Sequence, residues 1–384
     1  MNKLPSDWQI KTLNEVCFPS SSNIAYKDVK DKKGNYPIFG ASGIVAYADF
    51  YSKEKECLGI VKDGSVGKIF ILPAKSSVIS TLNYLENFDD LNIKYLYYFL
   101  HCINFKKYIK GSVIPHIYFR DYKKEKIPLP PLETQKQIAE RLDFLFDKID
   151  KALKLLNENK EYIKKYRLSI LKDAFEGKLT HPSKNWEIKS LGEVCEINPK
   201  NKLDDNLEVS FIPMNLILDK FQNKFSYEIK KWKDIKKGYT HLQNNCIALA
   251  KITPCFENGK CVILRNLKNG YGAGTTELII ILPNYKKIII EYVFYFMNTQ
   301  YFMEQGKRNF KGSVGQLRIG TDFITNFKIP IPSIEIQKEI VSILDTKFKS
   351  MEEIERLNNE NIENLLLLKK SLLKEAFSGK MNTK

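Results

Sequence analysis

The sequence predicts an α+β protein made of two copies of one plan, in which a globular domain is followed by a long helix. The two helices are expected to form an antiparallel coiled coil, which would relate the copies by an approximate twofold axis. Three observations predict this fold: one stretch of sequence occurs twice, each copy ends in a heptad repeat, and the segments before the repeats alternate short aliphatic runs with glycine-containing loops. The predicted parts are globular domains at 1–126 and 181–328 and helical segments at 127–180 and 329–384.

The duplication covers nearly the whole chain. The segment WQIKTLNEVC that begins at Trp8 returns as WEIKSLGEVC at Trp186, an offset of 178 residues. The segment IPLPPLETQKQI at Ile127 returns as IPIPSIEIQKEI at Ile329, an offset of 202. The second copy therefore carries about two dozen extra residues, and a period near 200 is too long for a solenoid repeat.

Short strands and one aromatic helix are predicted in each globular domain. The helices are expected at Tyr95–Leu100 and Tyr292–Met297, as buried helix faces; base-stacking platforms are the alternative. The strands follow from aliphatic runs between turn residues, and they are expected at Leu58–Val61, Lys68–Leu72, Val78–Thr81, Cys246–Lys251, Lys260–Leu264 and Glu277–Leu282.

A helix of some 45 residues, roughly 65 to 70 Å long, is predicted after each proline pair. Glu133 and Glu335 stand where the helix dipole favours an acidic side chain. Gly177 and Gly379 can end the helices in the left-handed conformation. The heptad pattern predicts a buried seam that includes Leu142, Ile149, Leu156, Asn159, Ile163, Leu344, Met351, Asn361, Leu365 and Leu372.

Two arrangements can bury these seams. The two helices can pair with each other, with Asn159 and Asn361 fixing the register as polar residues in a heptad core. Alternatively, each helix can be a stalk that pairs between chains. The first arrangement also accounts for two unlike globular domains on one chain.

The excess of basic residues lies in the globular domains. The 384 residues carry a net charge of +16, divided as +6 in residues 1–126, +2 in 127–180, +8 in 181–328 and 0 in 329–384. A lysine-rich genome would scatter the surplus evenly, whereas this distribution indicates a polyanionic partner for both domains.

Several other classes of protein are disfavoured. The N-terminal segment lacks the pattern of a signal peptide and no apolar run is long enough to span a membrane, so a cytosolic protein is expected. The seven cysteines form no CxxC pair, which argues against a disulfide framework and a zinc ribbon. Cys255 and Cys261 have no histidine at ligand spacing, so a structural metal site is also disfavoured. Motifs for nucleoside triphosphate binding, for a serine nucleophile and for a zinc peptidase are missing, as is the N-P-P-[FY] motif of adenine methyltransferases. No enzyme active site and no cofactor are therefore expected in this chain.

The repeated IPxPxxExQ segment, its following heptad helix and the closing motifs LKDAFEGKL at Leu171 and LKEAFSGKM at Leu373 resemble the specificity subunit of type I restriction-modification systems. PIFGASG at Pro37, KDGSVGK at Lys62 and ITPCFENGK at Ile252 are also typical of that family. The resemblance implies two target-recognition domains that each read one half of a bipartite site in double-stranded DNA. It further implies that the helices set the spacing and dock two methyltransferase subunits, which use S-adenosylmethionine, and that restriction subunits use ATP and Mg²⁺.

The resemblance also implies DNA contacts from the glycine-containing loops, because glycine lets backbone approach a phosphate while polar side chains read bases. These loops differ after the shared GSV, so the two half-sites should differ. The implied contact residues are Ser42, Lys62, Ser65, Lys110, Ser112, His116 and Arg120 in the first domain, and Thr253, Asn258, Lys260, Thr275, Thr276, Lys311, Ser313, Gln316 and Arg318 in the second.

Two other functions fit parts of the pattern. A non-catalytic scaffold that bridges DNA would need no methyltransferase partner. A nuclease with an unrecognised carboxylate site would cut DNA with Mg²⁺ alone, but only Asp121 and Asp322 recur in both copies, and their surroundings indicate a structural role.

Overall fold

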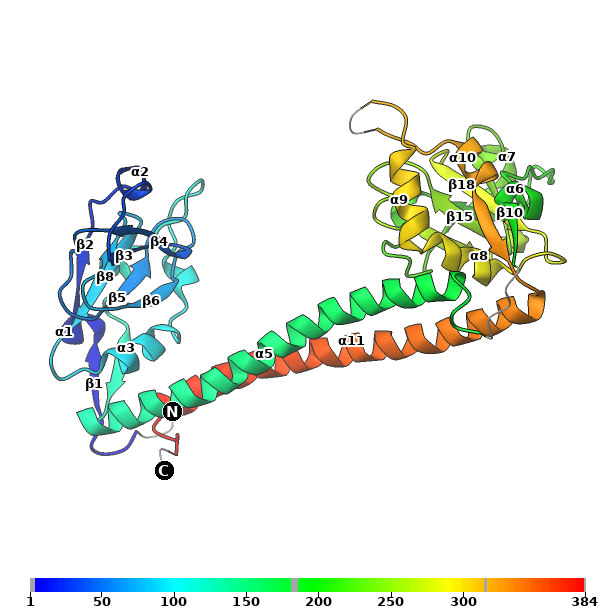
Figure 1. The fold of residues 1–384 in the computed structure, drawn as a ribbon. Coiled ribbons are helices and arrows are strands. Elements are labelled where there is room, and N and C mark those ends of the chain that lie inside the picture. Colours follow the sequence, from blue (N-terminus) through cyan, green and yellow to red (C-terminus); the bar gives the residue numbers. More distant parts are fainter. Residues whose placement is uncertain (1–3, 181–185, 314–315, 383–384) are drawn as a thin grey trace. The chain divides into compact units, whose positions relative to one another are not determined.

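The computed structural model describes residues 4–180, 186–313 and 316–382. The chain divides into two compact units (Figure 1). Unit 1 consists of residues 1–157 and 358–384, and unit 2 consists of residues 158–357. Each unit therefore contains one sheet-bearing lobe and a part of both long helices.

Unit 1 has a four-stranded sheet in the order β2-β8-β5-β6, a three-stranded sheet β4-β3-β7 and a two-stranded ribbon β1-β9. Its elements are β1 (Gln9–Thr12), α1 (Leu13–Val16), β2 (Cys17–Ser21), α2 (Tyr26–Val29), β3 (Tyr36–Gly40), β4 (Gly43–Ala48), β5 (Cys57–Val61), β6 (Ile69–Leu72), β7 (Ser77–Val78), β8 (Leu82–Asn87), α3 (Ile93–Leu100), the 3₁₀ turn η1 (Phe105–Tyr108), α4 (Phe119–Tyr122), β9 (Lys126–Leu129) and the start of α5 (Leu132–Phe175).

Unit 2 has a four-stranded sheet in the order β11-β18-β15-β16, a second sheet β13-β12-β17-β14 and a ribbon β10-β19. Its elements are β10 (Glu187–Ser190), α6 (Leu191–Val194), β11 (Cys195–Ile197), β12 (Glu208–Ile212), η2 (Met214–Leu216), β13 (Glu228–Lys231), α7 (Trp232–Ile235), β14 (Thr240–Gln243), β15 (Cys246–Ala250), β16 (Cys261–Leu264), η3 (Lys268–Gly270), β17 (Tyr271–Gly274), β18 (Leu278–Pro283), α8 (Ile290–Met297), α9 (Gln300–Arg308), α10 (Thr321–Asn326), β19 (Lys328–Ile331) and the start of α11 (Ile334–Ala376).

The strand orders of the two units match, which confirms the internal duplication. In each unit the second sheet contains one parallel pair, β3 with β7 and β12 with β17. Unit 2 adds strand β14 at the edge of that sheet and has helix α9 where unit 1 has only the turn η1. These additions account for part of the extra length of the second copy. Among the predicted strands, Val78–Thr81 is wrong in extent, because β7 ends at Val78.

The motif that opens each copy is a capping box. The carboxylate of Glu15 accepts a hydrogen bond of 2.7 Å from the backbone N–H of Thr12, and Glu193 accepts one of 2.6 Å from Ser190. The threonine or serine hydroxyl also donates to the same carboxylate in each case. These hydrogen bonds hold the pKa of both glutamates below the ordinary value. The short helices α1 and α6 are thereby fixed at the end of their ribbon strands.

The long helices have the predicted size and limits. Helix α5 has 44 residues and α11 has 43, with Glu133 and Glu335 in their first turns. Gly177 and Gly379 follow the helix ends with φ of +72° each, which is the left-handed stop that the sequence predicts. In unit 1, the C-terminal end of α11 packs beside the start of α5, and in unit 2 the C-terminal end of α5 packs beside the start of α11. The helices are therefore antiparallel within each unit.

The buried stripe of α11 corrects one predicted seam residue. The predicted heptad contains both Asn358 and Asn361. Leu344, Met351 and Asn358 are buried as predicted, but Asn361 is exposed. After Leu344 the predicted heptad steps by three and then four residues, whereas the buried stripe steps by four and then three. Alternate predicted positions therefore fall one residue before the stripe, and these are Lys347, Ile354, Asn361 and Leu368. The polar residue inside the α11 seam is thus Asn358.

A buried glutamine joins each lobe to its helix. The side chain of Gln135 accepts from the backbone N–H of Asn92 at 2.8 Å and donates to the carbonyls of Asp90 at 3.1 Å and Pro130 at 2.9 Å. In unit 2, the side chain of Gln337 accepts from the N–H of Ile289 at 3.0 Å. It also donates to the carbonyls of Lys287 at 3.1 Å and Pro332 at 2.9 Å. The glutamine of the repeated IPxPxxExQ motif thus connects the first turn of the long helix to the start of α3 or α8.

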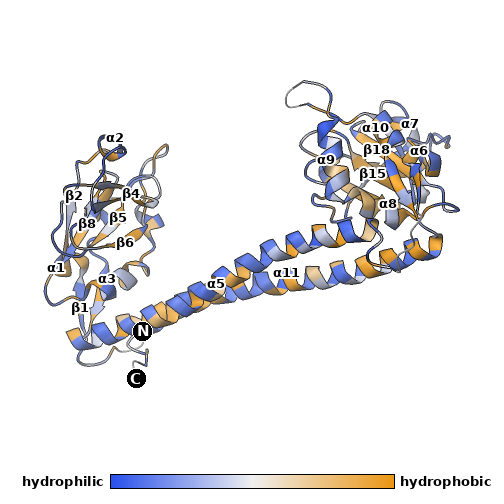
Figure 2. Cartoon of the chain, in the orientation of Figure 1, coloured by the Kyte–Doolittle hydropathy of each residue, from blue (hydrophilic) through white to orange (hydrophobic). Residues whose placement is uncertain are grey.

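Two tyrosines reinforce this joint in each unit. The hydroxyl of Tyr95 donates to the Pro128 carbonyl at 2.7 Å, and the hydroxyl of Tyr98 donates to Asp143 on α5 at 2.5 Å. Unit 2 repeats both contacts, with Tyr292 to the Pro330 carbonyl and Tyr295 to Asp345 on α11. The predicted aromatic helices are therefore buried packing faces. Figure 2 shows their apolar residues next to the apolar sheet strands.

We expect Gln135→Leu to lower the free energy of unfolding of unit 1 by about 2 to 3 kcal/mol, because it leaves the Asn92 N–H and the carbonyls of Asp90 and Pro130 without their side-chain partner. Urea denaturation followed by circular dichroism measures the change. The matched control is Gln137→Leu, since Gln137 is exposed one half-turn further along α5. Equal destabilisation by both variants would contradict the role assigned to Gln135.

Candidate nucleic-acid interface

The two predicted contact loops of unit 1 are joined by backbone hydrogen bonds. In the loop after β5, the carbonyl of Lys62 accepts from the N–H of Ile117 at 2.9 Å. The N–H of Gly64 donates to the carbonyl of Pro115 at 2.8 Å. The second loop is closed at its base, because the N–H and carbonyl groups of Lys110 and His116 exchange two hydrogen bonds, of 2.9 and 2.8 Å.

The loops of unit 2 have the same backbone connections. The carbonyl of Lys251 accepts from the N–H of Ile319 at 3.0 Å, and the N–H of Thr253 donates to the carbonyl of Leu317 at 2.9 Å. Lys311 and Arg318 exchange two hydrogen bonds of 2.9 Å, as Lys110 and His116 do in unit 1. Arg318 is thus the structural counterpart of His116, and the loop of unit 2 is one residue longer.

The counterpart positions carry different side chains. The N–H of Lys62 donates to the carbonyl of Thr81 at 2.9 Å, and the N–H of Lys251 donates to the carbonyl of Glu277 at 2.9 Å. Thr81 and His116 in unit 1 therefore correspond to Glu277 and Arg318 in unit 2. The same backbone framework carries Thr81, whose hydroxyl is buried, and an imidazole in unit 1, and it carries a carboxylate and a guanidinium in unit 2.

An ion pair orients Arg318. Its Nε and Nη2 atoms donate to the Glu277 carboxylate at 2.9 to 3.1 Å, and its Nη1 atom donates to the carbonyl of Gln316 at 2.8 Å. These hydrogen bonds lower the pKa of Glu277 and raise that of Arg318. Two parallel hydrogen bonds to one carboxylate fix the orientation of the planar guanidinium group. Glu277 was not among the predicted contact residues, because its partner lies 41 residues away along the chain.

Lys110, His116 and Arg120 form a basic and aromatic group in unit 1. The ammonium of Lys110 lies 2.9 Å from the carboxylate of Asp121, while the guanidinium of Arg120 lies 4.6 Å from the ring centroid of Tyr118. The rings of His116 and Tyr118 are 5.1 Å apart between centroids. Asp121 therefore has the structural role that the sequence indicates, since it holds the lysine of the recurring KGSV segment.

Other predicted contact residues are also exposed, on these loops or on other turns. Ser42 lies in the turn between β3 and β4, which receives a hydrogen bond of 3.3 Å from Lys68 to the carbonyl of Ala41. Thr275 accepts from the N–H of Glu277 at 3.2 Å, so its hydroxyl supports the loop that carries this carboxylate. The exposed members are Ser42, Ser65, Lys110, Ser112, Arg120, Asn258, Thr276, Lys311, Ser313 and Gln316.

Lys260 has a structural environment. Its ammonium donates to the carbonyls of Met214 at 3.0 Å and Ile217 at 2.8 Å and lies 3.5 Å from Asp219. Its side chain is only 14% exposed. The ammonium thus fastens the segment after β12 to the sheet, a use of lysine that the sequence pattern did not predict.

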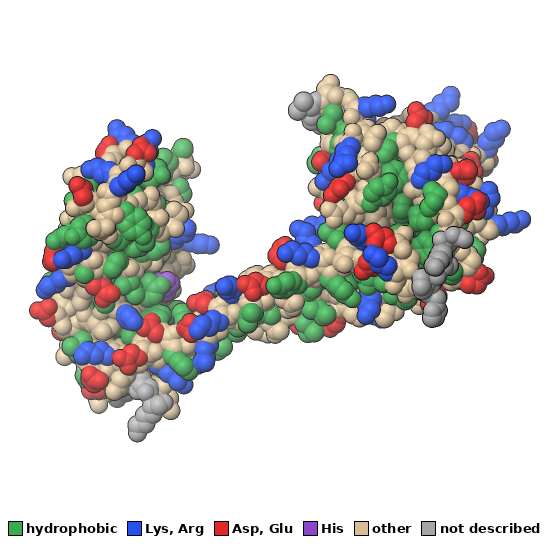
Figure 3. Space-filling view, in the orientation of Figure 1, with side chains coloured by type: hydrophobic (Ala, Val, Ile, Leu, Met, Phe, Trp, Pro, Cys, Tyr) green, Lys and Arg blue, Asp and Glu red, His purple; other side chains and the backbone are tan. Residues whose placement is uncertain are grey.

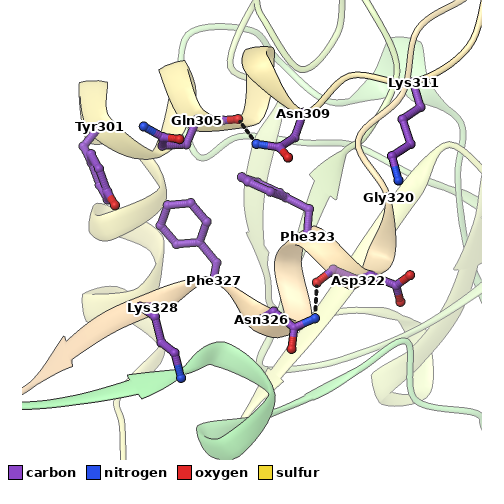
Figure 4. Close-up of a pocket in the computed structure, with 10 residues that line it drawn as sticks. All are labelled: Tyr301, Gln305, Asn309, Lys311, Gly320, Asp322, Phe323, Asn326, Phe327 and Lys328. Atoms are coloured by element: carbon purple, nitrogen blue, oxygen red, sulfur yellow. Dashed lines mark hydrogen bonds between the residues drawn. The ribbon is translucent and has the colours of Figure 1, made fainter.

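A pocket of about 450 Å³ lies next to the loop of unit 2 (Figure 4). Helices α9 and α10 form its walls, and the rings of Phe323 and Phe327, 5.1 Å apart between centroids, form an apolar part of the lining. Lys311 and Lys328 contribute cations at its sides, and Asp322 contributes a carboxylate. This pocket was not predicted, because its residues come from two stretches of sequence, 301–311 and 320–328, that only the fold brings together.

Within the described ranges, no group of three or more histidine, cysteine or acidic side chains is placed to hold a metal ion. The same residues contain no helix that is long and apolar enough to cross a membrane. Figure 3 shows lysine and arginine side chains on both units, interspersed with acidic ones.

The family model described as the type I restriction modification DNA specificity domain matches residues 5–164 and 183–364. Each matched range includes one lobe and part of the helix that follows it. The two joints and both pairs of contact loops fall inside these ranges.

Curated relatives agree with that match. The specificity subunit of the type I restriction enzyme EcoAI from Escherichia coli is 47% identical over 157 residues, which are 41% of this chain and 27% of that protein. The EcoEI specificity subunit, from the same organism, is 43% identical over 157 residues, which are 41% of this chain and 26% of that protein. The chain thus matches about a quarter of the length of these two relatives. The MjaVIII specificity subunit of Methanocaldococcus jannaschii is 27% identical over an alignment that covers 100% of this chain and 95% of that protein.

Solved structures share the fold. The HsdS subunit from Thermoanaerobacter tengcongensis superposes with a TM-score of 0.57 at 17% identity and covers 99% of this chain and 98% of its own. A chain from a structural study of complex assembly and conformational transition of the type I restriction-modification system gives a TM-score of 0.73 at 16% identity, with 99% and 100% of the two chains covered. Since the family model matches most of both copies, this chain belongs to the family of type I restriction modification DNA specificity domains.

Proposed function

We propose that this chain is the DNA-specificity subunit of a type I restriction-modification complex and that each lobe binds one half of a bipartite site in double-stranded DNA. One observation carries the proposal. Both units build the same loop framework from the same backbone hydrogen bonds, yet they fill its counterpart positions with different side chains. Two lobes with the same framework and different polar side chains are suited to binding the same kind of ligand, DNA, while each recognises a different base sequence.

The charge distribution supports duplex DNA as that ligand. The lobes carry +6 and +8, whereas the helical segments carry +2 and 0. Lysines would contact phosphates and set the orientation of the lobe, while Gln316 and Arg318 in unit 2 and His116 in unit 1 would read base edges. The half-sites should therefore differ in sequence.

The helices support the assignment of protein partners. Several large apolar side chains are exposed on them, among them Phe144, Leu155, Tyr162 and Leu367. Exposed apolar residues on a helix whose seam is already occupied suit the docking of further subunits. In this proposal two methyltransferase subunits dock there and supply S-adenosylmethionine-dependent methylation, and restriction subunits supply the ATP- and Mg²⁺-dependent steps. This chain would contribute recognition and no catalytic group.

Methylation mapping tests the proposed function. We expect single-molecule sequencing of host DNA to show one bipartite motif that is methylated when the gene is present and unmethylated when it is deleted. A tagged copy of the chain should also copurify with a methyltransferase subunit. Unchanged methylation together with purification of the chain alone would favour the scaffold instead.

Arg318→Ala should weaken recognition of one half-site only, by about 1 to 3 kcal/mol if the guanidinium makes a bidentate base contact. Glu277→Gln should act at the same half-site with a smaller effect, since it loosens the orientation of Arg318. Binding of the purified complex to duplexes mutated in each half-site measures both. The matched control is Arg356→Ala, because Arg356 makes a similar two-bond pair with Glu353 on α11. Equal losses at both half-sites would count against the assignment.

The spacing between half-sites should follow the length of the helices. Inserting seven residues into both α5 and α11, near residues 157 and 357, adds about 10 Å of helix and keeps the heptad phase. We expect the mapped spacer to grow by about three base pairs, with both half-sequences unchanged. A spacer of the original length would rule out the helices as its determinant, provided that the variant still methylates DNA.

A further inference from the structure

The tip of the closed loop in unit 1 exposes two neighbouring apolar side chains. Val113 is 90% exposed and Ile114 is 63% exposed. A single exposed apolar residue is common on protein surfaces and requires no explanation. Two adjacent ones at the end of a projecting loop, among residues already assigned to a ligand surface, indicate a contact that the isolated chain leaves unfilled.

The loop holds this tip in a fixed conformation. The two hydrogen bonds between Lys110 and His116 close its base, and the bond from Gly64 to Pro115 ties its far side to the loop after β5. Gly111 has a φ of +86°, and a Cβ atom there would lie 2.4 Å from the carbonyl oxygen of Ile114. Only glycine therefore permits this closure. A tip that is already ordered loses little conformational entropy when it binds.

The surroundings of the tip are basic and aromatic. Lys110 and His116 stand at the base of the loop, and Arg120 lies over the ring of Tyr118 just beyond it. Two carboxylates also lie at the base of the loop: Asp121 forms an ion pair with Lys110, and Asp63 stands opposite His116 in a β-bridge. Cations that flank a pair of apolar side chains match the surface of duplex DNA, where phosphates surround the stacked bases. Architectural DNA-binding proteins insert apolar side chains between base pairs in this way.

We propose that Val113 and Ile114 form a wedge that inserts between two adjacent base pairs at the half-site bound by unit 1 and bends the duplex there. This inference rests on the proposed function, because it requires the loop to face DNA. The wedge adds recognition by deformability, since base-pair steps that unstack easily would be preferred at that position.

The second copy differs in sequence where the wedge stands. After the shared KGSV segment, the first copy continues with Ile114 and Pro115. The second copy continues after Val314 with Gly315 and Gln316, so Gly315 is the counterpart of Ile114. Val314 and Gly315 lie outside the described residues, so the comparison is one of sequence. The second copy replaces the branched apolar side chain by glycine, and we therefore expect the distortion at the first half-site alone.

The test uses the purified complex, or the full chain if it binds DNA alone, with duplexes that carry the mapped site and 2-aminopurine at each position in turn. We expect wild-type protein to raise the fluorescence at one step in the half-site of unit 1, which reports unstacking, and to bend end-labelled duplexes by about 20 to 90°. The double variant Val113→Ser with Ile114→Ser should still bind the site but should abolish both signals. Ile10→Ser is the matched control, because Ile10 is 60% exposed on β1, outside the contact loops.

The outcomes separate the possible errors. Equal fluorescence and bending for wild type and the double variant would overturn the wedge and leave the proposed function intact. Loss of copurification with the methyltransferase subunit in the double variant, with DNA distortion retained, would identify the tip as a protein contact and also overturn it. A wild-type protein that binds no DNA in any assembly would overturn the proposed function itself, and the wedge with it.

Discussion

The hydrogen bonds of one buried glutamine connect each lobe to its long helix, and the arrangement of each unit depends on them. Gln135 and Gln337 satisfy one N–H and two carbonyl groups each, at the place where three segments meet. No apolar side chain could do so, and buried backbone groups without partners would open the joint. Because the glutamine lies in the first turn, the direction of the helix is set by the lobe from which it starts.

This joint lets a common scaffold carry different side chains on its loops. The partners of each glutamine are backbone atoms, so neighbouring side chains can change without loss of the hydrogen bonds. The contact loops follow the same principle, since backbone bonds close them at Lys110 with His116 and at Lys311 with Arg318. Side chains at these positions are then free to differ between an imidazole in one unit and a paired guanidinium in the other. In the proposed function, this combination would let two half-sites differ while protein partners dock on similar helices.

Local patterns in the sequence predicted the parts that depend on local physics. The helix limits followed from glutamates in the first turns and from glycines with φ of +72° after the last. The α11 seam was less predictable. A heptad leaves two ways to alternate steps of three and four. Both Asn358 and Asn361 fit the predicted seam, and only Asn358 is buried, because burial depends on which face the partner helix covers. The resemblance predicts a DNA contact for Lys260 in its glycine-containing loop, whereas its ammonium donates to two carbonyls that are distant in sequence.

The sequence by itself determined the duplication, the α+β class, the two long helices, the positive charge of the lobes and the family resemblance, because all of these are properties of neighbouring residues or of their repetition. Only the tertiary structure decided which residues meet across the loops. It paired Arg318 with Glu277, made His116 the counterpart of Arg318 and left Val113 and Ile114 uncovered. The physical reason is that contacts between distant segments depend on how the sheets place their loops, and no periodicity along the chain encodes that placement.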